Sequence, residues 1–164
     1  MLHAETLATA ATLLQAMQAR SLTLATAESC TGGLIAAALT AIPGSSATLL
    51  AGYVTYSNAA KQATLGVSAE TLRQHGAVSR ATAIEMVQGA LRTAQSDLAV
   101  ACTGIAGPDG GSEAKPVGLV FIGCGGKGRP VCAHGFVFPG DRAAVRAATV
   151  DAAFALLRAE LLGI

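Results

Sequence analysis

The sequence predicts an α/β fold: a three-layer α/β/α sandwich with a mixed β-sheet, formed as one domain over residues 1–164. Segments with helical and strand-like patterns alternate through most of the chain, which is typical of parallel strands connected by helices. Two strand-like segments then follow one another around a short glycine-rich turn, which predicts a hairpin and therefore a mixed sheet. A chain of 164 residues is long enough for one full hydrophobic core.

The first half of the chain begins with an amphipathic pattern, in which Leu7, Leu14 and Met17 recur at helical spacing. A short apolar run then suits a buried strand, and the Ala/Leu/Ile run after it suits a helix. Residues that favour β-structure, such as Tyr53 and Thr55, mark the next strand. We therefore expect helices over residues 5–19, 31–41 and 59–65, and strands over residues 22–27 and 49–56.

Capping residues mark the helices of the second half. Ser68 and Ser79 are good N-caps, and Gly76 between them is a good C-cap. Asp141 is the expected N-cap of the last helix. We expect helices over residues 68–75, after Ser79 and after Asp141, strands over residues 97–103, 116–124 and 130–138, and a glycine-rich loop over residues 104–115. The strand over residues 97–103 is an apolar run, which indicates burial on both faces.

The composition limits the classes of function. Charged residues make up only 13% of the chain, well below the ~25% of ordinary soluble proteins, while 52% of the residues are hydrophobic. So little polar surface favours a homo-oligomer, and we expect a dimer. A net charge of +1 and an aromatic content of 4% argue against nucleic-acid binding, which uses basic surfaces and stacking platforms.

The sequence shows no targeting or metal-binding pattern. No apolar run reaches the ~18 residues of a membrane span, and no basic segment precedes an apolar one at the N-terminus. The four cysteines (Cys30, Cys102, Cys124 and Cys132) have no C-x-x-C spacing, so we expect reduced thiols and no metal site. These features predict a cytoplasmic protein that does not associate with membranes.

The turn over residues 28–33 carries the clearest chemistry. It consists of Glu28, Ser29, Cys30, Thr31, Gly32 and Gly33, and it separates a predicted strand from a predicted helix. The first N–H groups of a helix lack internal partners and attract anions, and Ser29 and Cys30 are both possible nucleophiles. The turn is neither a P-loop nor a G-x-S-x-G elbow. Either Ser29 or Thr31 merely caps the helix, or a nucleophile lies beside an oxyanion hole of backbone N–H groups.

A serine nucleophile needs a general base. The three histidines (His3, His75 and His134) lie near the N-terminus, at a helix end and inside a strand, and none of them completes a Ser-His-Asp pattern. Lysine can act as the base when burial lowers its pKa toward neutrality. Lys61 and Lys115 both flank predicted strand ends, so both are candidates.

Other polar turns also follow strands. Ligands bind open α/β sheets at the carboxyl ends of strands, so the turns at Ser29, Ser57, Thr103 and Gly140 are expected around one opening. The loop over residues 104–115 is either a flexible surface loop or a phosphate cradle of backbone N–H groups. Arg142 lies in the first turn of a predicted helix, where the helix dipole favours anions, which hints at an external partner such as phosphate.

Six motifs, taken together, resemble one known family. They are Ala27 to Gly33, Val54 to Asn58 with Lys61, Gly76 to Ser79, Thr103 to Pro108, Lys115 to Gly118, and Gly140 to Arg142. In this order they resemble the CinA C-terminal domain family, the nicotinamide-nucleotide amidohydrolases or NMN deamidases. The resemblance runs from about Leu7 to Leu161, and the chain looks like the stand-alone form without the molybdopterin-binding-like domain of longer CinA proteins.

The resemblance implies an activity and a set of site residues. The family hydrolyses the carboxamide of nicotinamide mononucleotide (NMN), a small molecule, to nicotinate mononucleotide and ammonia, by a Ser/Lys mechanism without a cofactor or metal. Ser29 would be the nucleophile, Lys61 its general base, and Tyr56 would assist proton transfer or hold the lysine. The substrate-binding residues would be Glu28, Cys30, Thr31, Gly32, Gly33, Asn58, Thr103, Gly104 and Arg142, with Arg142 on the phosphate.

Three alternatives stay open. Cys30 rivals Ser29 as the nucleophile. A chain of this family can also be a nucleotide-binding or interaction module of the competence and DNA-damage type, without turnover. The substrate can instead be the amide of another nucleotide. One departure from the family pattern is Ala59, where many members have Glu, and this change affects the rim of the pocket rather than the chemistry.

Overall fold

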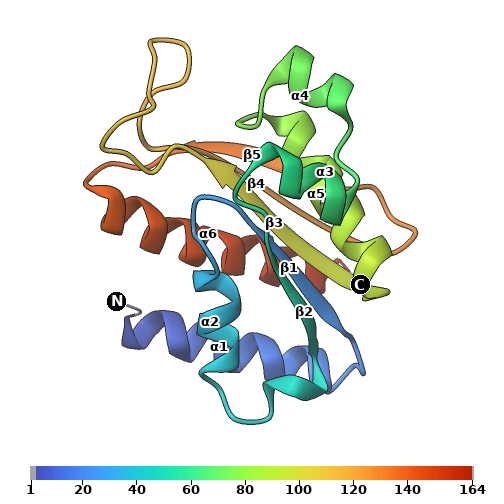
Figure 1. Ribbon diagram of the computed structural model, residues 1–164. Helices are drawn as coiled ribbons and strands as arrows, with labels where there is room; N and C mark the ends of the chain where they lie inside the picture. Colours follow the sequence, from blue (N-terminus) through green and yellow to red (C-terminus); the bar gives the residue numbers. More distant parts are fainter. Residues whose placement is uncertain (1–2, 164) are drawn as a thin grey trace.

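The computed structural model describes residues 3–163 and shows a five-stranded mixed sheet between two layers of helices (Figure 1). The strands are β1 (Leu24–Glu28), β2 (Leu49–Val54), β3 (Leu98–Gly104), β4 (Leu119–Gly126) and β5 (Cys132–Val137), in the spatial order β2-β1-β3-β4-β5. β1 pairs in parallel with β2 and β3, while β4 is antiparallel to both β3 and β5. The predicted mixed sheet with a late hairpin is confirmed.

The helices cover both faces of the sheet. One face is covered by α1 (Ala4–Gln18), α2 (Leu34–Thr40) and α6 (Arg142–Leu162), and the other by α3 (Asn58–Leu65), α4 (Ala69–His75) and α5 (Arg80–Ala94) (Figure 1). A short 3-10 helix, η1 (Ser45–Ala47), precedes β2 and was not predicted. Among residues 3–163, none of the helices combines the length and apolarity needed to cross a membrane.

The central strand β3 is buried on both faces, as its apolar sequence predicts. Leu98, Val100 and Cys102 face the cluster under α6, while Ala99 and Ala101 face the cluster under α5. A glycine then brings α3 close to α5. A Cβ atom at Gly89 would lie 2.1 Å from the carbonyl oxygen of Leu65, so only glycine allows this contact. Close packing here fixes the position of α3.

The caps confirm most helix starts in the second half. The side chains of Ser68, Ser79 and Asp141 each accept a hydrogen bond from a backbone N–H three residues later. The predicted start of a helix at residue 31 was wrong. Gly32 and Gly33 have φ angles of 61° and 97°, in the left-handed region, so α2 begins only at Leu34.

The predicted strands over residues 49–56 and 116–124 were also placed wrongly at one end. β2 ends at Val54, and β4 begins at Leu119. In the first case, the N–H of Thr55 still donates to the carbonyl of Glu28, and the chain then turns toward α3. In the second, Gly118 has a φ angle of 91°, which interrupts extended structure.

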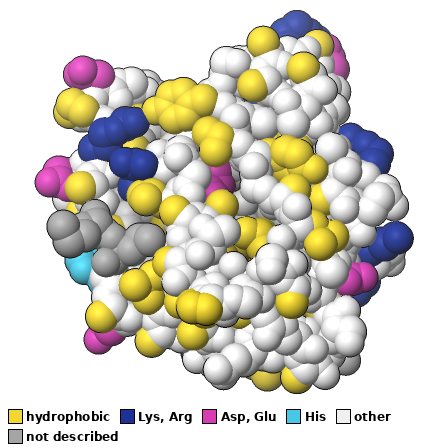
Figure 2. All heavy atoms as spheres, turned by 60° about the horizontal axis from the view of Figure 1, so that its bottom comes forward, with side chains coloured by type: hydrophobic (Ala, Val, Ile, Leu, Met, Phe, Trp, Pro, Cys, Tyr) yellow, Lys and Arg dark blue, Asp and Glu magenta, His cyan; other side chains and the backbone are white. Residues whose placement is uncertain are grey.

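The surface carries few charges, as the composition predicts. Figure 2 brings the lower side of Figure 1 forward and shows Lys, Arg, Asp and Glu side chains mainly at the periphery of this face. Hydrophobic and uncharged groups occupy most of the remainder. The four cysteines are free thiols, of which only Cys132 is exposed, in agreement with the predicted reduced state.

Candidate active site

The carboxyl ends of β1, β2 and β3 open onto one cavity of about 280 Å³. These strands are parallel, so their ends meet at the same edge of the sheet. The cavity is lined by Ser29, Cys30, Tyr56, Lys61, Ala77, Val78, Thr103, Gly104, Ile105, Ala106, Gly107, Asp109, Gly110 and Arg142. Six of the predicted site residues besides Ser29 therefore line the same cavity as this serine.

Ser29 and Lys61 form the centre of the cavity. The Nζ atom of Lys61 lies 3.0 Å from the Oγ atom of Ser29, 2.8 Å from the carbonyl oxygen of Thr55 and 3.5 Å from that of Tyr56. A neutral amine has two N–H donors and one lone pair. The two carbonyl groups can take the two donors, and the lone pair then faces the hydroxyl group of Ser29.

Burial makes the neutral form of Lys61 accessible. The side chain is only 1% exposed, and desolvation lowers the pKa of Lys61 below its ordinary value of 10.5. Lys61 lies in the first turn of α3, whose N-terminus is capped by the side chain of Ser57 through the N–H of Ala60. This cap and the close packing of α3 on α5 direct the lysine inward.

The N-terminus of α2 does not have the predicted role. The carboxylate of Glu28 accepts hydrogen bonds from the N–H groups of Gly33, Ile35 and Ala36 at 2.9 to 3.0 Å. It also accepts one from the hydroxyl of Thr31 at 2.6 Å. The predicted anion site is therefore filled by a side chain of the protein itself, and the N–H groups of Gly33, Ile35 and Ala36 are not available to an oxyanion or a substrate.

Three residues predicted to bind substrate thus lie behind the surface of the cavity and do not line it. Glu28 and Thr31 are 1% and 0% exposed, and the N–H of Gly33 is used by the Glu28 carboxylate. Gly32 does not line the cavity either, and its N–H donates to the carbonyl of Ser29. The cause is the turn geometry, because the two glycines fold the chain back so that Glu28 reaches the start of α2.

Cys30 lines the cavity but its thiol is a poor nucleophile. The contact with the thiol of Cys102 and burial both raise the pKa of Cys30, so the thiolate is disfavoured. Its backbone N–H, in contrast, donates no hydrogen bond to another residue of the described chain. This geometry favours Ser29 over Cys30 as the nucleophile and leaves the N–H of Cys30 as a donor beside it.

Tyr56 and Arg142 form the rim of the cavity. The guanidinium group of Arg142 donates to the hydroxyl of Tyr56 at 2.8 Å and to the carbonyl of Gly107 at 2.9 Å. The hydroxyl of Tyr56, which was predicted to assist proton transfer or hold the lysine, is bonded to Arg142, and the carbonyl group of Tyr56 faces the lysine. Arg142 joins the end of β2 to the loop after β3.

Thr103 has a structural contact at the cavity. Its hydroxyl donates to the carbonyl of Ala77 at 2.7 Å and so fixes the segment before α5 against the end of β3. Asn58 is exposed at the start of α3 and does not line the cavity. Lys115, the other candidate base, is directed away, because its Nζ atom donates to the carbonyl of His75 at 2.7 Å.

The expected single opening is only partly formed. Ser57 lies outside the cavity, and Gly140 lines a neighbouring cavity of about 620 Å³ that shares Ala106 and Arg142 with the first. Arg146, one helical turn after Arg142, also lines that neighbouring cavity. Arg146 donates to the carbonyl of Thr31 at 2.7 Å, and so ties α6 to the turn that carries Ser29.

Three contributions to the site were not predicted. They are the carbonyl of Thr55, the walls formed by Ala77 and Val78, and the anchor formed by Arg146. Arg146 had one signal in the sequence, because it lies four residues after Arg142 and therefore on the same face of a helix. Thr55, Ala77 and Val78 lie within two of the motifs that carry the family resemblance, but a backbone carbonyl group and apolar side chains do not indicate a chemical role by themselves.

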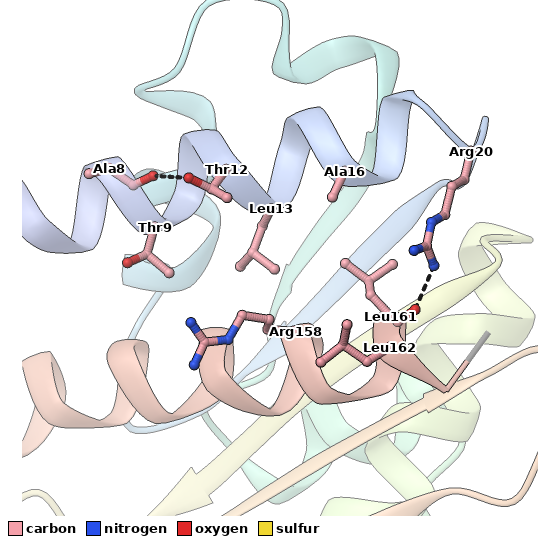
Figure 3. A pocket seen from close by; sticks show the side chains of 9 residues that line it. All are labelled: Ala8, Thr9, Thr12, Leu13, Ala16, Arg20, Arg158, Leu161 and Leu162. Atoms are coloured by element: carbon pink, nitrogen blue, oxygen red, sulfur yellow. Dashed lines mark hydrogen bonds between the residues drawn. The ribbon is translucent and has the colours of Figure 1, made fainter.

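A separate apolar cavity of about 280 Å³ lies between α1 and α6 (Figure 3). Its walls are apolar side chains with two threonines and two arginines, and Arg20 donates to the carbonyl of Leu161 across it. No nucleophile is paired with a base in this cavity. Within residues 3–163, no group of three or more His, Cys, Asp or Glu side chains is arranged to hold a metal ion.

Comparison with characterised sequences identifies relatives of two lengths. The chain is 55% identical over 137 residues to the nicotinamide-nucleotide amidohydrolase PncC of Escherichia coli strain K12, with 80% of each chain covered. It is 62% identical over 107 residues to a CinA-like protein of Chloroherpeton thalassium, covering 65% of this chain and 26% of that protein.

Solved structures have the same fold. The competence/damage-inducible protein CihA of Agrobacterium tumefaciens superposes with a TM-score of 0.94 at 46% identity, with 97% of both chains covered. A CinA superfamily protein of Escherichia coli superposes with a TM-score of 0.90 at 37% identity, covering 96% of this chain and 92% of that one. The sequence model of the CinA C-terminal domain matches residues 6–161. The chain therefore belongs to the CinA C-terminal domain family.

Proposed function

We propose that this chain hydrolyses the carboxamide group of NMN to nicotinate mononucleotide and ammonia. The observation that carries the proposal is the 3.0 Å approach of Lys61 Nζ to Ser29 Oγ in a cavity at the carboxyl edge of the sheet. The relatives named nicotinamide-nucleotide amidohydrolase support the substrate. A serine paired with a buried lysine is suited to acyl transfer from an amide.

The first step is attack by Ser29. Neutral Lys61 takes the hydroxyl proton through its lone pair, while its two N–H groups donate to the carbonyl groups of Thr55 and Tyr56. The Oγ atom then bonds to the carboxamide carbon, and the carbonyl oxygen becomes an oxyanion. The N–H of Cys30 is a suitable donor to it, because it lies beside the nucleophile and is not used elsewhere in the described chain.

The next steps release both products. The proton on Lys61 passes to the amide nitrogen, the C–N bond breaks, and ammonia leaves with Ser29 acylated. A water molecule then gives a proton to Lys61 and attacks the ester carbon. The Ser29 ester bond breaks, its Oγ atom recovers the proton, and nicotinate mononucleotide leaves. Ser29 and Lys61 return to their starting states, so one water is consumed for each ammonia released.

The nucleotide end of the substrate is proposed to lie toward the rim. Arg142 is the one cation that lines both the catalytic cavity and the larger cavity beside it, among the residues described. A guanidinium group binds phosphate oxygens through two parallel N–H donors. The loop after β3 is proposed to add backbone N–H groups along the same wall, from Ala106, Gly107, Asp109 and Gly110, whereas the N–H of Ile105 is bonded to the carbonyl of Leu119.

The remaining features of the proposal concern the whole chain. We propose that residues 1–164 act as one amidohydrolase domain, located in the cytoplasm, with a small-molecule substrate and no nucleic-acid partner. We also propose that it forms a homo-oligomer. The low charge content supports the oligomer, and the near-neutral net charge of +1 supports the absence of nucleic-acid binding.

The test is ammonia release from NMN by the purified chain, beside the variants Ser29→Ala and Lys61→Ala. We expect a loss of several orders of magnitude in kcat for both variants, because the nucleophile and its base act as a unit. Lys115→Ala is the matched control, since this lysine bonds to His75 outside the cavity, and it should keep the wild-type rate.

Other outcomes separate the alternatives. Near-full activity of Ser29→Ala, together with an inactive Cys30→Ala, would make Cys30 the nucleophile. A wild-type chain that binds NMN in calorimetry but releases no ammonia would be a binding module instead of an enzyme. Turnover of another nucleotide amide in preference to NMN would change the substrate but keep the Ser/Lys chemistry.

A further inference from the structure

Asp109 brings a negative charge to the catalytic cavity. Among the described residues that line this cavity, it is the only one with a carboxyl group. The two ion pairs of the described chain involve other acids, and the guanidinium group of Arg142 donates instead to Tyr56 and Gly107. Asp109 is therefore an exposed acid at the cavity without a cationic partner in the described chain.

The loop that carries Asp109 is held in place on both sides of this residue. It connects β3 to β4 and rises from the carboxyl edge of the sheet (Figure 1). At its base, the N–H of Gly118 donates to the carbonyl of Ile105 at 2.8 Å. Two residues before Asp109, the carbonyl of Gly107 accepts a hydrogen bond from Arg142 at 2.9 Å. These bonds keep Asp109 at the cavity wall.

The other charged groups around Ser29 are compensated by the protein itself. The carboxylate of Glu28 is 1% exposed and accepts four hydrogen bonds at the start of α2. Burial favours the neutral form of Lys61. Among the described residues, Asp109 and Arg142 are thus the two charged groups at the cavity that a ligand can meet, one negative and one positive.

The proposed substrate carries two charges of the complementary signs. The pyridinium ring of NMN is positive because its nitrogen is bonded to ribose, and the phosphate group is negative. Since Arg142 is proposed to bind the phosphate, the ring charge is left to be matched by a negative group. Coulomb attraction falls off slowly with distance and does not require direct contact between Asp109 and the ring.

We propose that Asp109 makes the site selective for cationic pyridinium rings over uncharged rings. The inference rests on the proposed function, and it names the class of substrate that the site accepts, which is N-ribosylated pyridinium carboxamides. The attraction strengthens when the ligand displaces water from the cavity, because the local dielectric constant falls. Asp109 determines specificity and takes no part in the making or breaking of bonds at Ser29.

The binding of three ligands tests this selectivity. They are NMN, nicotinamide riboside, which keeps the ring charge but lacks the phosphate, and reduced NMN, which keeps the phosphate but has an uncharged dihydropyridine ring. Dissociation constants are measured by calorimetry in a Ser29→Ala background, so that hydrolysis does not interfere. Asp109→Asn should raise those of NMN and the riboside by the same factor, about three- to fivefold for one exposed ion pair, and leave that of reduced NMN unchanged.

A second acid of the same loop provides the matched control. Glu113 is exposed and does not line the cavity, so Glu113→Gln removes the same charge without changing the site. All three dissociation constants should stay at their original values in this variant. Asp109→Asn should keep its circular dichroism spectrum and Tm, because Asp109 is exposed as well.

Weaker binding of all three ligands to Asp109→Asn would overturn the inference, because the residue would then serve the ribose group or the loop. Unchanged binding of all three, or an equal effect of Glu113→Gln, would overturn it too. Ammonia release by the wild-type chain tests the proposed activity separately. A chain that hydrolyses NMN without this selectivity keeps the activity and loses the inference, the expected selectivity without ammonia release does the reverse, and absence of NMN binding overturns both.

Discussion

The Nζ atom of Lys61 lies 3.0 Å from the Oγ atom of Ser29, although the two residues are 32 positions apart in the sequence. The lysine is among the largest side chains with less than 2% exposure in the described chain, and burial favours its uncharged form. Two backbone carbonyl groups, of Thr55 and Tyr56, leave its lone pair for the serine.

The pH dependence of hydrolysis should report the proton on Lys61. The base must be neutral, and desolvation lowers the pKa of Lys61 below 10.5. We expect kcat/KM for NMN to rise with pH along an acid limb and to level off before pH 10.5. A pH–rate profile with ammonia as the readout checks this. A rate that is unchanged from acid to alkaline pH would argue against a lysine base.

The buried lysine should reduce stability at neutral pH. The folded pKa of Lys61 is lower than the unfolded value of 10.5, so the unfolded state binds more protons between the two values. The free energy of unfolding should therefore rise with pH through this window. Lys61→Met should remove that rise and stabilise the chain below the window, as measured by urea unfolding at several pH values. Lys127→Met, in an exposed hairpin turn, is the control and should keep the rise.

Glu28 should be a structural residue. Its carboxylate accepts four hydrogen bonds and is 1% exposed, whereas the amide group of Glu28→Gln has only one acceptor oxygen. We expect the variant to lose about 2 to 3 kcal/mol of unfolding free energy, as for other buried charge-assisted bonds. Glu5→Gln, at an exposed position on α1, should change it by less than about 0.5 kcal/mol. Equal stabilities in urea would contradict this role.

Arg142 should determine the preference for a phosphorylated substrate. Arg142→Ala removes the cation at the rim and the contacts to Tyr56 and Gly107. We expect kcat/KM for NMN to fall roughly ten- to hundredfold, the equivalent of a charge-assisted contact of about 1.5 to 3 kcal/mol. Nicotinamide riboside, which lacks the phosphate, should be affected much less. Arg158→Ala, beside the separate α1–α6 cavity, is the control. An equal loss for both substrates would mean that Arg142 serves only to hold the rim.

Local sequence determined much of the fold. The caps at Ser68, Ser79 and Asp141 involve residues three positions apart, and the burial of β3 follows from its own apolar run. The order of helices and strands was predictable for the same reason, because each element depends on periodicity within a few turns. Element ends were less predictable where a glycine with positive φ intervenes, as at Gly33 and Gly118.

Tertiary structure decided the chemistry of the site. The residue patterns left Lys61 and Lys115 as equivalent candidates and only the family resemblance favoured Lys61, whereas the packing of α3 brings Lys61 to Ser29 while Lys115 reaches His75. The helix after the turn was expected to bind an external anion, but the chain folds back so that Glu28 fills its N-terminus. Caps and strand patterns are local, whereas burial, desolvation and the partners of a side chain depend on segments that are distant in the sequence. For this reason the sequence alone determined the layers, and the folded chain determined which residues meet between them.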